Sequence, residues 1–308
     1  MQGLVLHIDS NHLVLWERLE AAGYTNHAAY TESLDQLRPL LAEAVGLIVR
    51  SRLPIDAAFI EAAPQLRWIG RVGSGLENID LTAAQSRGIQ VYHAAEGNQN
   101  AVGEHALGML LSLLNRVHLA HAEMQQGIWL RAENRGCELE GKTVGIIGYG
   151  RMGQSLARKL SGFDCRVLAY DIVPHLGNAY ATQVSLPELQ AQADVISLHV
   201  PLLESTRHLI NRAFIEACAK PFWLINTARG PVIDTQAVVE AVQQGQIRGA
   251  CLDVHEFESR SFEQVAQHPL WDTLLHDPRF LLTPHIAGWT HESYYKLSAV
   301  LADKVLGG

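Results

Sequence analysis

The sequence has few cysteines, no excess of basic residues and no long apolar run. Its four cysteines are far apart in 308 residues and form no Cys-x-x-Cys pair, which favours reduced thiols in a cytoplasmic protein. Lys and Arg number 24 against 32 Asp and Glu, so the net charge of −8 argues against nucleic acid or an anionic membrane as the main partner. No apolar run approaches the roughly 18 residues of a membrane span, and the first residues do not resemble a signal peptide. Fibrous, disordered, secreted and membrane classes are therefore not expected.

Short apolar runs alternate with longer amphipathic segments along the whole chain, whose length suggests two domains. Runs such as VGIIG and VISLHV suit strands that are buried on both faces, as in a parallel sheet. This alternation predicts an α/β doubly wound architecture. We expect one long helix over 100–126, and a long connection with one helical turn over 255–279. The expected strands span 4–9, 46–50, 66–71, 89–94, 143–148, 167–171, 194–200, 222–227, 249–254 and 280–283.

A glycine pattern directly follows the strand expected over 143–148. In GYGRMG, Gly148 permits a tight turn, Gly150 lets the backbone approach a pyrophosphate, and Gly153 lets the helix pack on the strand. The next strand ends at Asp171, 18 residues after Gly153, where a carboxylate can bind both ribose hydroxyls and would repel a 2′-phosphate. The pattern predicts NAD rather than NADP as the cofactor. A glycine-rich turn in an unrelated α/β fold is the alternative.

Two other patterns have the wrong surroundings for the sites that they resemble. GCELEGKT over 136–143 has phosphate-loop spacing, but it follows a polar segment and opens a strand. A phosphate loop must open a helix, so that backbone N–H groups converge on the phosphate. His118 and His121 have metal-ligand spacing on a helix but lack a third ligand. We therefore expect neither a phosphate loop nor a metal site.

Successive strands of the second half are each followed by a residue that could bind a ligand or take part in catalysis: Gly148, Asp171, His199, Arg229, Asp253 and His285. In open α/β sheets ligands bind at the carboxyl ends of strands, so this series predicts the lining of a binding site. Hydride transfer at a carbinol carbon needs an acid/base and a cation that holds a carboxylate. His285 and Arg229 have these properties. A turn-capping histidine and a surface arginine that pairs with Asp234 are the alternatives.

Five segments, in order and at family-like spacing, resemble the D-isomer-specific 2-hydroxyacid dehydrogenases: GKTVGIIGYGRMG, DVISLHVPLLESTRHLI, FWLINTARGPVID, GACLDV and LLTPHIAG. The resemblance covers nearly the whole chain. It implies an NAD-dependent oxidoreductase that acts on the CH–OH group of a small 2-hydroxy or 2-keto acid. It also implies a Rossmann coenzyme domain over 98–285, inserted into a flavodoxin-like substrate domain over 1–97 and 286–308. Homodimers would form through the coenzyme domains.

The resemblance implies a role for each matching residue. Arg229 matches the arginine that grips the 2-keto acid, and His285 matches the acid/base. The family's glutamate lies five residues after the position of Asp253, which gives Glu258 as the partner of His285, with Glu256 as the alternative. The matching substrate-binding positions are Arg50, Val72, Gly73, Ser74 and Gly75. Besides the three glycines, the matching cofactor positions are Arg151, Met152, Asp171, His199, Pro201, Thr206, Thr227 and Asp253.

The substrate is less closely defined by the resemblance. Arg50, Arg71 and Arg131 resemble basic positions that phosphoglycerate dehydrogenases of the family use for phosphate, which favours 3-phosphoglycerate. Glyoxylate, hydroxypyruvate and D-lactate-type acids are alternatives. The chain stops at Gly308, as in short forms without an appended regulatory domain. Trp289 stands where a small residue is common, and either narrows the substrate pocket or packs in an interface. A non-enzymatic NAD-binding regulator is the alternative from another functional class.

Overall fold

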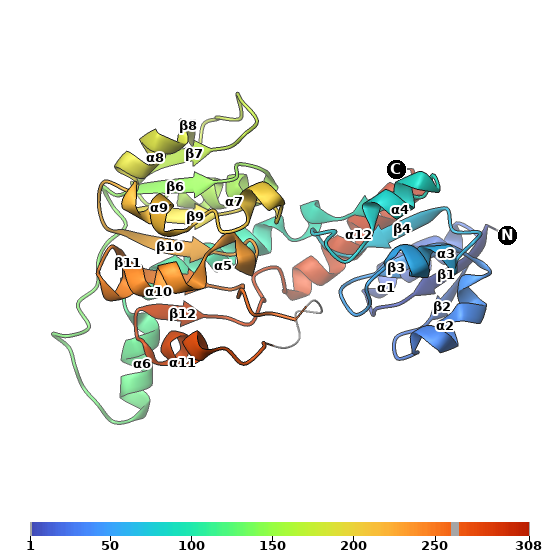
Figure 1. Cartoon of the computed structure of the whole chain (residues 1–308), viewed down its shortest axis with the longest axis horizontal. Helices are drawn as coiled ribbons and strands as arrows, with labels where there is room; N and C mark the ends of the chain where they lie inside the picture. The colour runs from blue at the N-terminus through green and yellow to red at the C-terminus, as the bar shows by residue number, and fades with distance from the viewer. Residues whose placement is uncertain (1, 260–264, 308) are drawn as a thin grey trace. The chain divides into compact units, whose positions relative to one another are not determined.

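The computed structural model describes residues 2–259 and 265–307, which form two compact α/β units (Figure 1). Among these residues, unit 1 comprises 2–98, 259 and 289–307, and unit 2 comprises 99–258 and 265–288. Positions 1, 260–264 and 308 of the expected domain ranges lie outside the described residues. No helix within the described ranges has both the length and the apolar character needed to cross a membrane.

Unit 1 contains a parallel five-stranded sheet in the order β2-β1-β3-β4-β5, which is the flavodoxin-like order. Its strands are β1 (Gly3–His7), β2 (Tyr24–Ala28), β3 (Ala44–Val49), β4 (Trp68–Arg71) and β5 (Gln90–His93). One face packs around Leu47 and Ile69 against α2 (Leu34–Leu41), α3 (Ala57–Glu61) and α4 (Leu81–Ser86). The other face packs around Val5 and Ile48 against α1 (Leu13–Ala21) and α12 (His291–Leu306), so the chain's last helix belongs to this unit.

Unit 2 contains a parallel seven-stranded sheet in the order β12-β11-β10-β9-β6-β7-β8. Its strands are β6 (Thr143–Ile147), β7 (Arg166–Tyr170), β8 (Thr182–Gln183), β9 (Val195–Leu198), β10 (Phe222–Asn226), β11 (Ile247–Leu252) and β12 (Phe280–Leu282). The strand order reverses at β6, as in a Rossmann fold, and this switch point is where such sheets bind ligands. The predicted pair of doubly wound domains is confirmed.

Helices cover both faces of the unit 2 sheet. On one face α5 (Gln99–Leu114) and α7 (Arg151–Leu160) pack around Val144 and Ile225. On the other, Leu198, Leu224 and Val238 lie in a core formed with α8 (Leu186–Gln192), α9 (Arg212–Glu216), α10 (Thr235–Gln243) and α11 (Pro269–His276). Both faces of the unit 2 sheet are therefore buried from solvent, which explains the continuous apolar runs in its strands.

The single helix expected over 100–126 is wrong, because two helices occupy that stretch. Helix α5 ends at Leu114, and α6 spans Val117–Gln125. Arg116 between them has a left-handed φ of +54°, a conformation that interrupts a right-handed helix. None of the α6 residues is buried, so packing does not enforce the continuation that the apolar spacing suggested.

Three other elements were missed by the sequence analysis. Helix α11 replaces the single turn expected within 255–279; it begins at Pro269, and the His268 side chain accepts a hydrogen bond from the N–H of Leu270. The other two missed elements are strands β2 and β8, each of which lies at one outer edge of its sheet. An outer strand has only one strand neighbour, and the mixed polar sequence of β2 (YTNHA) has no strand-like apolar run.

Candidate active site

The turn after β6 has the geometry of a dinucleotide-binding turn. Gly148 has a φ of +91°, and a Cβ there would lie 2.7 Å from the carbonyl carbon of His199. A Cβ at Gly153 would lie 2.2 Å from the carbonyl oxygen of Gly148, so α7 packs directly on the turn. Within the described ranges, no atom beyond its chain neighbours lies within 4 Å of a Cβ built at Gly150. This leaves open space at the N-terminus of α7, where backbone N–H groups attract anions.

Asp171 follows β7 and faces the same turn. Its Oδ2 accepts a hydrogen bond from the Tyr149 N–H at 2.7 Å, and its Oδ1 accepts one from the Val173 N–H at 2.9 Å. The buried Tyr149 donates its hydroxyl proton to Asn178 Oδ1 at 2.9 Å, which ties the turn to the loop after β7. Asp171, His175, Asn178 and other residues between 170 and 185 line a cavity of about 900 Å³ that is open to solvent. The turn, the carboxylate and the cavity fit the pyrophosphate and adenosine of NAD.

Other predicted cofactor positions lie at the neighbouring strand ends. His199 follows β9, its Nε2 lies 2.8 Å from Ser197 Oγ, and burial lowers the pKa of His199 to about 4, so this ring is neutral at pH 7. The nearby Thr206 hydroxyl donates to the Pro201 carbonyl at 2.6 Å. Thr227 follows β10, and its buried hydroxyl has no hydrogen-bond partner among the described residues. A buried hydroxyl without a partner in the protein is available to form a hydrogen bond with a ligand. Arg151 and Met152 form the first turn of α7.

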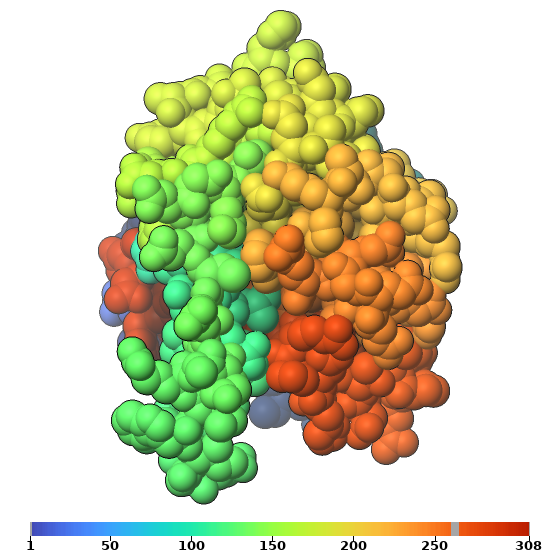
Figure 2. All heavy atoms as spheres, turned by 90° about the vertical axis from the view of Figure 1, so that its left-hand side faces the viewer, coloured from blue at the N-terminus to red at the C-terminus, as the bar shows by residue number. Residues whose placement is uncertain are grey.

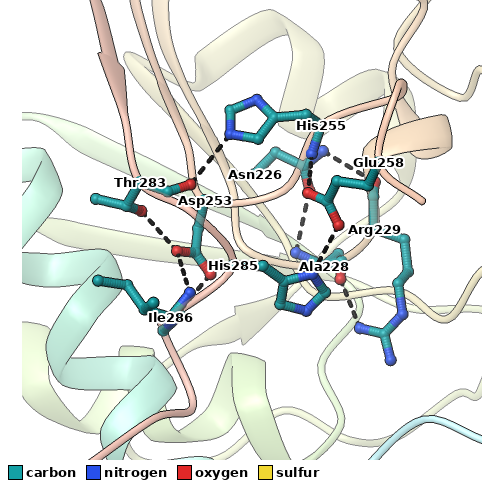
Figure 3. A network of polar contacts seen from close by, with 10 residues as sticks. Asn226, Ala228, Arg229, Asp253, His255, Glu258, Thr283, His285 and Ile286 are labelled. Atoms are coloured by element: carbon teal, nitrogen blue, oxygen red, sulfur yellow. Dashed lines mark hydrogen bonds and ion pairs between the residues drawn. The ribbon is translucent and has the colours of Figure 1, made fainter. Parts of the chain in front are cut away.

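His285 follows β12 and its side chain forms a hydrogen bond with Glu258 (Figure 3). Its Nδ1 lies 2.8 Å from Glu258 Oε2, and the two side chains are 22% and 9% exposed. Glu258 Oε1 also accepts a hydrogen bond from the His255 N–H. Because an ionised carboxylate only accepts, Nδ1 carries the proton and Nε2 is the ring atom that can exchange one with a substrate. Of the two candidate glutamates, Glu258 contacts His285, whereas Glu256 contacts His208.

Asp253 follows β11 and holds the loop that carries His285 (Figure 3). Its carboxylate is 1% exposed. Oδ1 accepts from the Thr283 hydroxyl at 2.5 Å and from the backbone N–H of 286 at 2.8 Å, and Oδ2 accepts from the backbone N–H of 287 at 2.9 Å. Burial disfavours the charge, but hydrogen bonds from His105, Thr283 and the loop keep the pKa of Asp253 below its ordinary value. The buried carboxylate thus fixes the backbone around His285.

Arg229 follows β10, the strand next to β11. The buried Asn226 holds this turn: its Nδ2 donates to the Arg229 carbonyl at 3.0 Å, and its Oδ1 accepts from the Ala228 N–H at 3.0 Å. Nη1 of Arg229 donates to the Ala228 carbonyl at 2.6 Å. Asp234, the alternative partner for this arginine, caps α10 by accepting from the Ala237 N–H. Neighbouring strands β10, β11 and β12 therefore bring a guanidinium, a buried carboxylate and an imidazole to one end of the sheet.

The predicted substrate loop lies in unit 1, after β4. The Ser74 hydroxyl donates to Asn98 Oδ1 at 2.7 Å, and a Cβ at Gly73 would lie 2.1 Å from Nη1 of Arg71, so a larger residue there would require this guanidinium to move. Arg71 is buried and donates from Nη1 to the Val72 carbonyl at 3.1 Å. The glycine loop is therefore braced by a buried guanidinium. Gly75 completes the loop and is partly exposed.

Arg50 follows β3 and lies on an aromatic ring. Its guanidinium carbon is 4.1 Å from the ring centroid of Trp289, which is 65% exposed, and its backbone N–H donates to Asp9 Oδ2 at 2.6 Å. Burial lowers the pKa of Arg50, although a guanidinium stays charged. Trp289 therefore contacts a predicted substrate-binding residue. Arg131 belongs to unit 2 and is exposed.

Comparisons with known proteins agree with this geometry. Residues 107–287 match the profile of a family described as D-isomer specific 2-hydroxyacid dehydrogenase, NAD binding domain. The chain is 38% identical to D-3-phosphoglycerate dehydrogenase of Haemophilus influenzae, over 95% of this chain and 71% of that protein. It is 36% identical to hydroxypyruvate reductase of Thermotoga maritima, over 88% of this chain and 87% of the relative. The chain belongs to the D-isomer specific 2-hydroxyacid dehydrogenase family.

A solved structure shares the fold of this dehydrogenase. D-lactate dehydrogenase from Aquifex aeolicus, complexed with NAD and lactic acid, superposes with a TM-score of 0.83 and is 28% identical over 99% of this chain and 94% of its own. The predicted family, the oxidoreductase class and NAD as the cofactor are confirmed. In the dehydrogenase, the 136–143 glycine pattern leads into β6, and no helix starts there.

Sequence reasoning missed two groups that support the site of the dehydrogenase. His105 of α5 has its Nε2 at 3.1 Å from Thr283 Oγ1 and 3.4 Å from Asp253 Oδ1. Asn226 braces the arginine turn, and its place inside the INTARG segment was an available signal. His105 had no such signal, because nothing in a helical stretch indicates which polar side chain meets a distant strand. Within residues 2–259 and 265–307, no group of three or more His, Cys, Asp or Glu side chains could hold a metal ion.

Proposed function

We propose that the chain is an NAD-dependent D-2-hydroxyacid dehydrogenase whose catalytic residues are Arg229, Glu258 and His285. The observation that carries this proposal is the His285–Glu258 hydrogen bond at 2.8 Å, on a loop held by a buried aspartate and next to the strand that ends in Arg229. An oriented acid/base beside a bidentate cation is what interconversion of a hydroxyl and a keto group requires.

Each catalytic residue has a defined role in the proposed mechanism. NAD, held by the strand-end residues described below, would supply the hydride acceptor for oxidation, and NADH the hydride donor for reduction. Nε2 of His285 takes the hydroxyl proton during oxidation and gives it to the carbonyl oxygen during reduction. Glu258 holds the ring through Nδ1 and stabilises the imidazolium. Arg229 binds the substrate carboxylate and polarises the carbonyl group.

The cofactor would lie along the carboxyl ends of the unit 2 strands. The open space at Gly150 and the first turn of α7 suit the pyrophosphate, and Asp171 suits the adenosine ribose. Thr227, with its unpartnered hydroxyl, suits a polar group of the cofactor. The remaining cofactor contacts that we propose are Gly148, Arg151, Met152, Gly153, His199, Pro201, Thr206 and Asp253.

Replacing Asp171 with asparagine is expected to weaken the preference for NADH over NADPH. A hydrogen bond to a charged group contributes about 1.5–3 kcal/mol, so the ratio of kcat/KM values should fall by about 10–10²-fold. Steady-state kinetics with both cofactors measures this ratio. Asp164→Asn, an exposed aspartate in the same unit, is the matched control and should leave it unchanged. An unaltered preference in Asp171→Asn would remove the aspartate from the ribose site.

The substrate that we favour is 3-phosphoglycerate, with glyoxylate, hydroxypyruvate or another 2-keto acid as alternatives. Arg50 and the loop Val72–Gly75 are the proposed substrate-binding residues. The stacked guanidinium of Arg50 supports an anionic substituent on the substrate. The Haemophilus influenzae relative is named a phosphoglycerate dehydrogenase, which also supports this choice.

A spectrophotometric panel at 340 nm tests both the activity and the substrate. Purified protein is mixed with NADH and with glyoxylate, hydroxypyruvate, pyruvate, phenylpyruvate, 2-oxoglutarate or 3-phosphohydroxypyruvate. We expect the fastest oxidation with the phosphorylated acid. Faster turnover of an unphosphorylated acid would reassign the substrate, and tight NADH binding without turnover of any acid would contradict the enzyme proposal.

We also propose that the protein is a cytoplasmic homodimer that assembles through its coenzyme domain. Residues 98–285 would form that domain, and 1–97 with 286–308 the substrate domain; the family match over 107–287 supports this division. All four cysteines are free thiols, as is usual in the cytoplasm. Large apolar side chains are exposed on α6 and on the segment after it, which Figure 2 shows as a green band on the surface of unit 2: Val117, Met124, Ile128, Trp129 and Leu130.

Replacing Trp129 with glutamate is expected to convert the dimer into a monomer. This indole is 76% exposed in the single chain, and an exposed apolar group of that size is typical of an interface. Sedimentation velocity at micromolar concentration distinguishes the two states. Ile172→Glu, which also changes an exposed apolar residue of unit 2, is the control and should stay dimeric. A monomeric wild type, or a dimeric Trp129→Glu variant, would contradict this interface.

A further inference from the structure

We propose that Glu256 is a positioning residue that holds the Arg229 turn in place by joining three loops at the carboxyl end of the unit 2 sheet. The proposal rests on the catalytic role assigned to Arg229 above. Glu256 follows β11 and stands two residues before Glu258. The two glutamates would thus have different roles: Glu258 orients the acid/base His285, and Glu256 positions the substrate-binding Arg229.

The carboxylate of Glu256 is bound on both oxygens. Oε1 lies 2.6 Å from Nε2 of His208. Oε2 accepts from the backbone N–H of Thr235 at 3.0 Å and from its hydroxyl at 2.7 Å. His208 belongs to the loop after the 3₁₀ turn Glu204–Thr206, and Thr235 opens α10. A single side chain therefore joins the loop after β9, the start of α10 and the loop after β11.

The loops that Glu256 joins contact the segment 230–234, which directly follows Arg229. The His208 N–H donates to the Pro231 carbonyl at 2.8 Å. Farther along, the Ile210 N–H donates to the Val232 carbonyl at 3.1 Å, and the backbone of 208–210 thus follows that of 231–234. A Cβ at Gly230 would lie 2.0 Å from the His255 carbonyl oxygen and 2.5 Å from the nitrogen of Glu256. The residue after Arg229 is thus packed directly on the backbone that carries Glu256.

A carboxylate suits this position for two physical reasons. It accepts from three donors at once, and its charge lies at the N-terminus of α10, where the helix dipole stabilises an anion. Glutamine keeps one carbonyl oxygen for Thr235 but presents an amide to His208. Alanine leaves the buried donors of Thr235 without an acceptor, so the loops lose their connection. The Arg229 guanidinium would then be displaced from the reacting geometry.

The test compares Glu256→Ala and Glu256→Gln with the wild type, using the acid that the panel identifies. A misplacement of about 1 Å costs about 10²-fold, so we expect kcat/KM for the acid to fall by about that factor in Glu256→Ala, mainly through KM. Glutamine should restore part of the loss. The Kd for NADH and the shape of the pH–rate profile should stay unchanged. The matched control is Glu240→Ala, which lies elsewhere on α10 and breaks an ion pair with Arg212 of α9.

Three results would overturn the positioning role. One is an unchanged kcat/KM in Glu256→Ala. Another is a pH–rate profile altered in the same way as in Glu258→Gln, which would place Glu256 in proton transfer. The third is an equal loss in Glu240→Ala, which would indicate a general effect on α10. If Glu256→Ala does not fold, His208→Asn removes one of the three connections and should raise the KM in the same direction.

Hydrogen exchange separates this proposal from the proposed function. If the wild type turns over no acid, the proposed function fails while the connection between the loops is still measurable. The amides of His208, Ile210 and Asp234, which donate between the two segments, should then exchange faster in Glu256→Ala than in wild type, because the segments are no longer held together. Unchanged exchange of these amides would overturn the positioning role whatever the activity.

Discussion

Replacing His285 with alanine is expected to lower kcat by about 10²–10⁴-fold, the range that general acid–base catalysis contributes. The ring would no longer exchange a proton with the substrate, and Glu258 cannot replace it because its Oε2 is directed at the ring position. NADH binding should change little, because the turn after β6 and Asp171 are separate from this loop. Stopped-flow single turnovers measure the chemical step, and fluorescence quenching measures the Kd for NADH.

The control for this histidine is His276→Ala, an exposed histidine that pairs with Asp272 on α11. It should keep wild-type kcat and NADH affinity. Equal losses of turnover and of NADH binding in His285→Ala would assign a structural role to the histidine. A loss of turnover alone would support the acid/base role, and Glu258→Gln should then lower kcat as well.

Replacing Arg229 with lysine is expected to lower kcat/KM for the 2-keto acid by about 10²–10³-fold, although the charge is kept. Lysine cannot form the two parallel hydrogen bonds that a guanidinium makes with a carboxylate. Each hydrogen bond between charged groups contributes about 1.5–3 kcal/mol, so the loss of one or two of them corresponds to a change of this size. Initial rates at saturating NADH give kcat and KM separately, and both should change.

Two controls accompany the arginine variant. Arg212→Lys alters an exposed arginine that pairs with Glu240, and should have wild-type kinetics. Arg229→Ala should regain part of its activity when free guanidinium is added, because the added cation can occupy the vacated space. Wild-type kcat/KM in Arg229→Lys would show that charge alone suffices, and an inactive Arg212→Lys would point to a general instability of arginine variants.

Much of the fold was predictable because the evidence for it is local. The parallel sheet of unit 2 is buried on both faces, so its strands appear in the sequence as continuous apolar runs. The glycine turn was also predictable, because the conformation of Gly148 and the close approach at Gly153 exclude other residues. The outer strand β2 and the end of helix α5 could not be predicted in this way. Strand β2 has a polar sequence, and the end of α5 depends on the left-handed Arg116, for which the surrounding sequence has no glycine or proline signal.

The candidate site divides in the same way. By itself, the sequence determined which residue types stand at the strand ends, including Asp171, Arg229 and His285, because a parallel sheet places all those ends on one edge. Only the tertiary structure decided between Glu256 and Glu258, which are two residues apart and differ in which distant loop each one meets. It also showed that the carboxylate of Asp253 is buried under the His285 loop. These partners lie 27–48 positions away along the chain. The direction of a loop side chain depends on packing that no local pattern encodes.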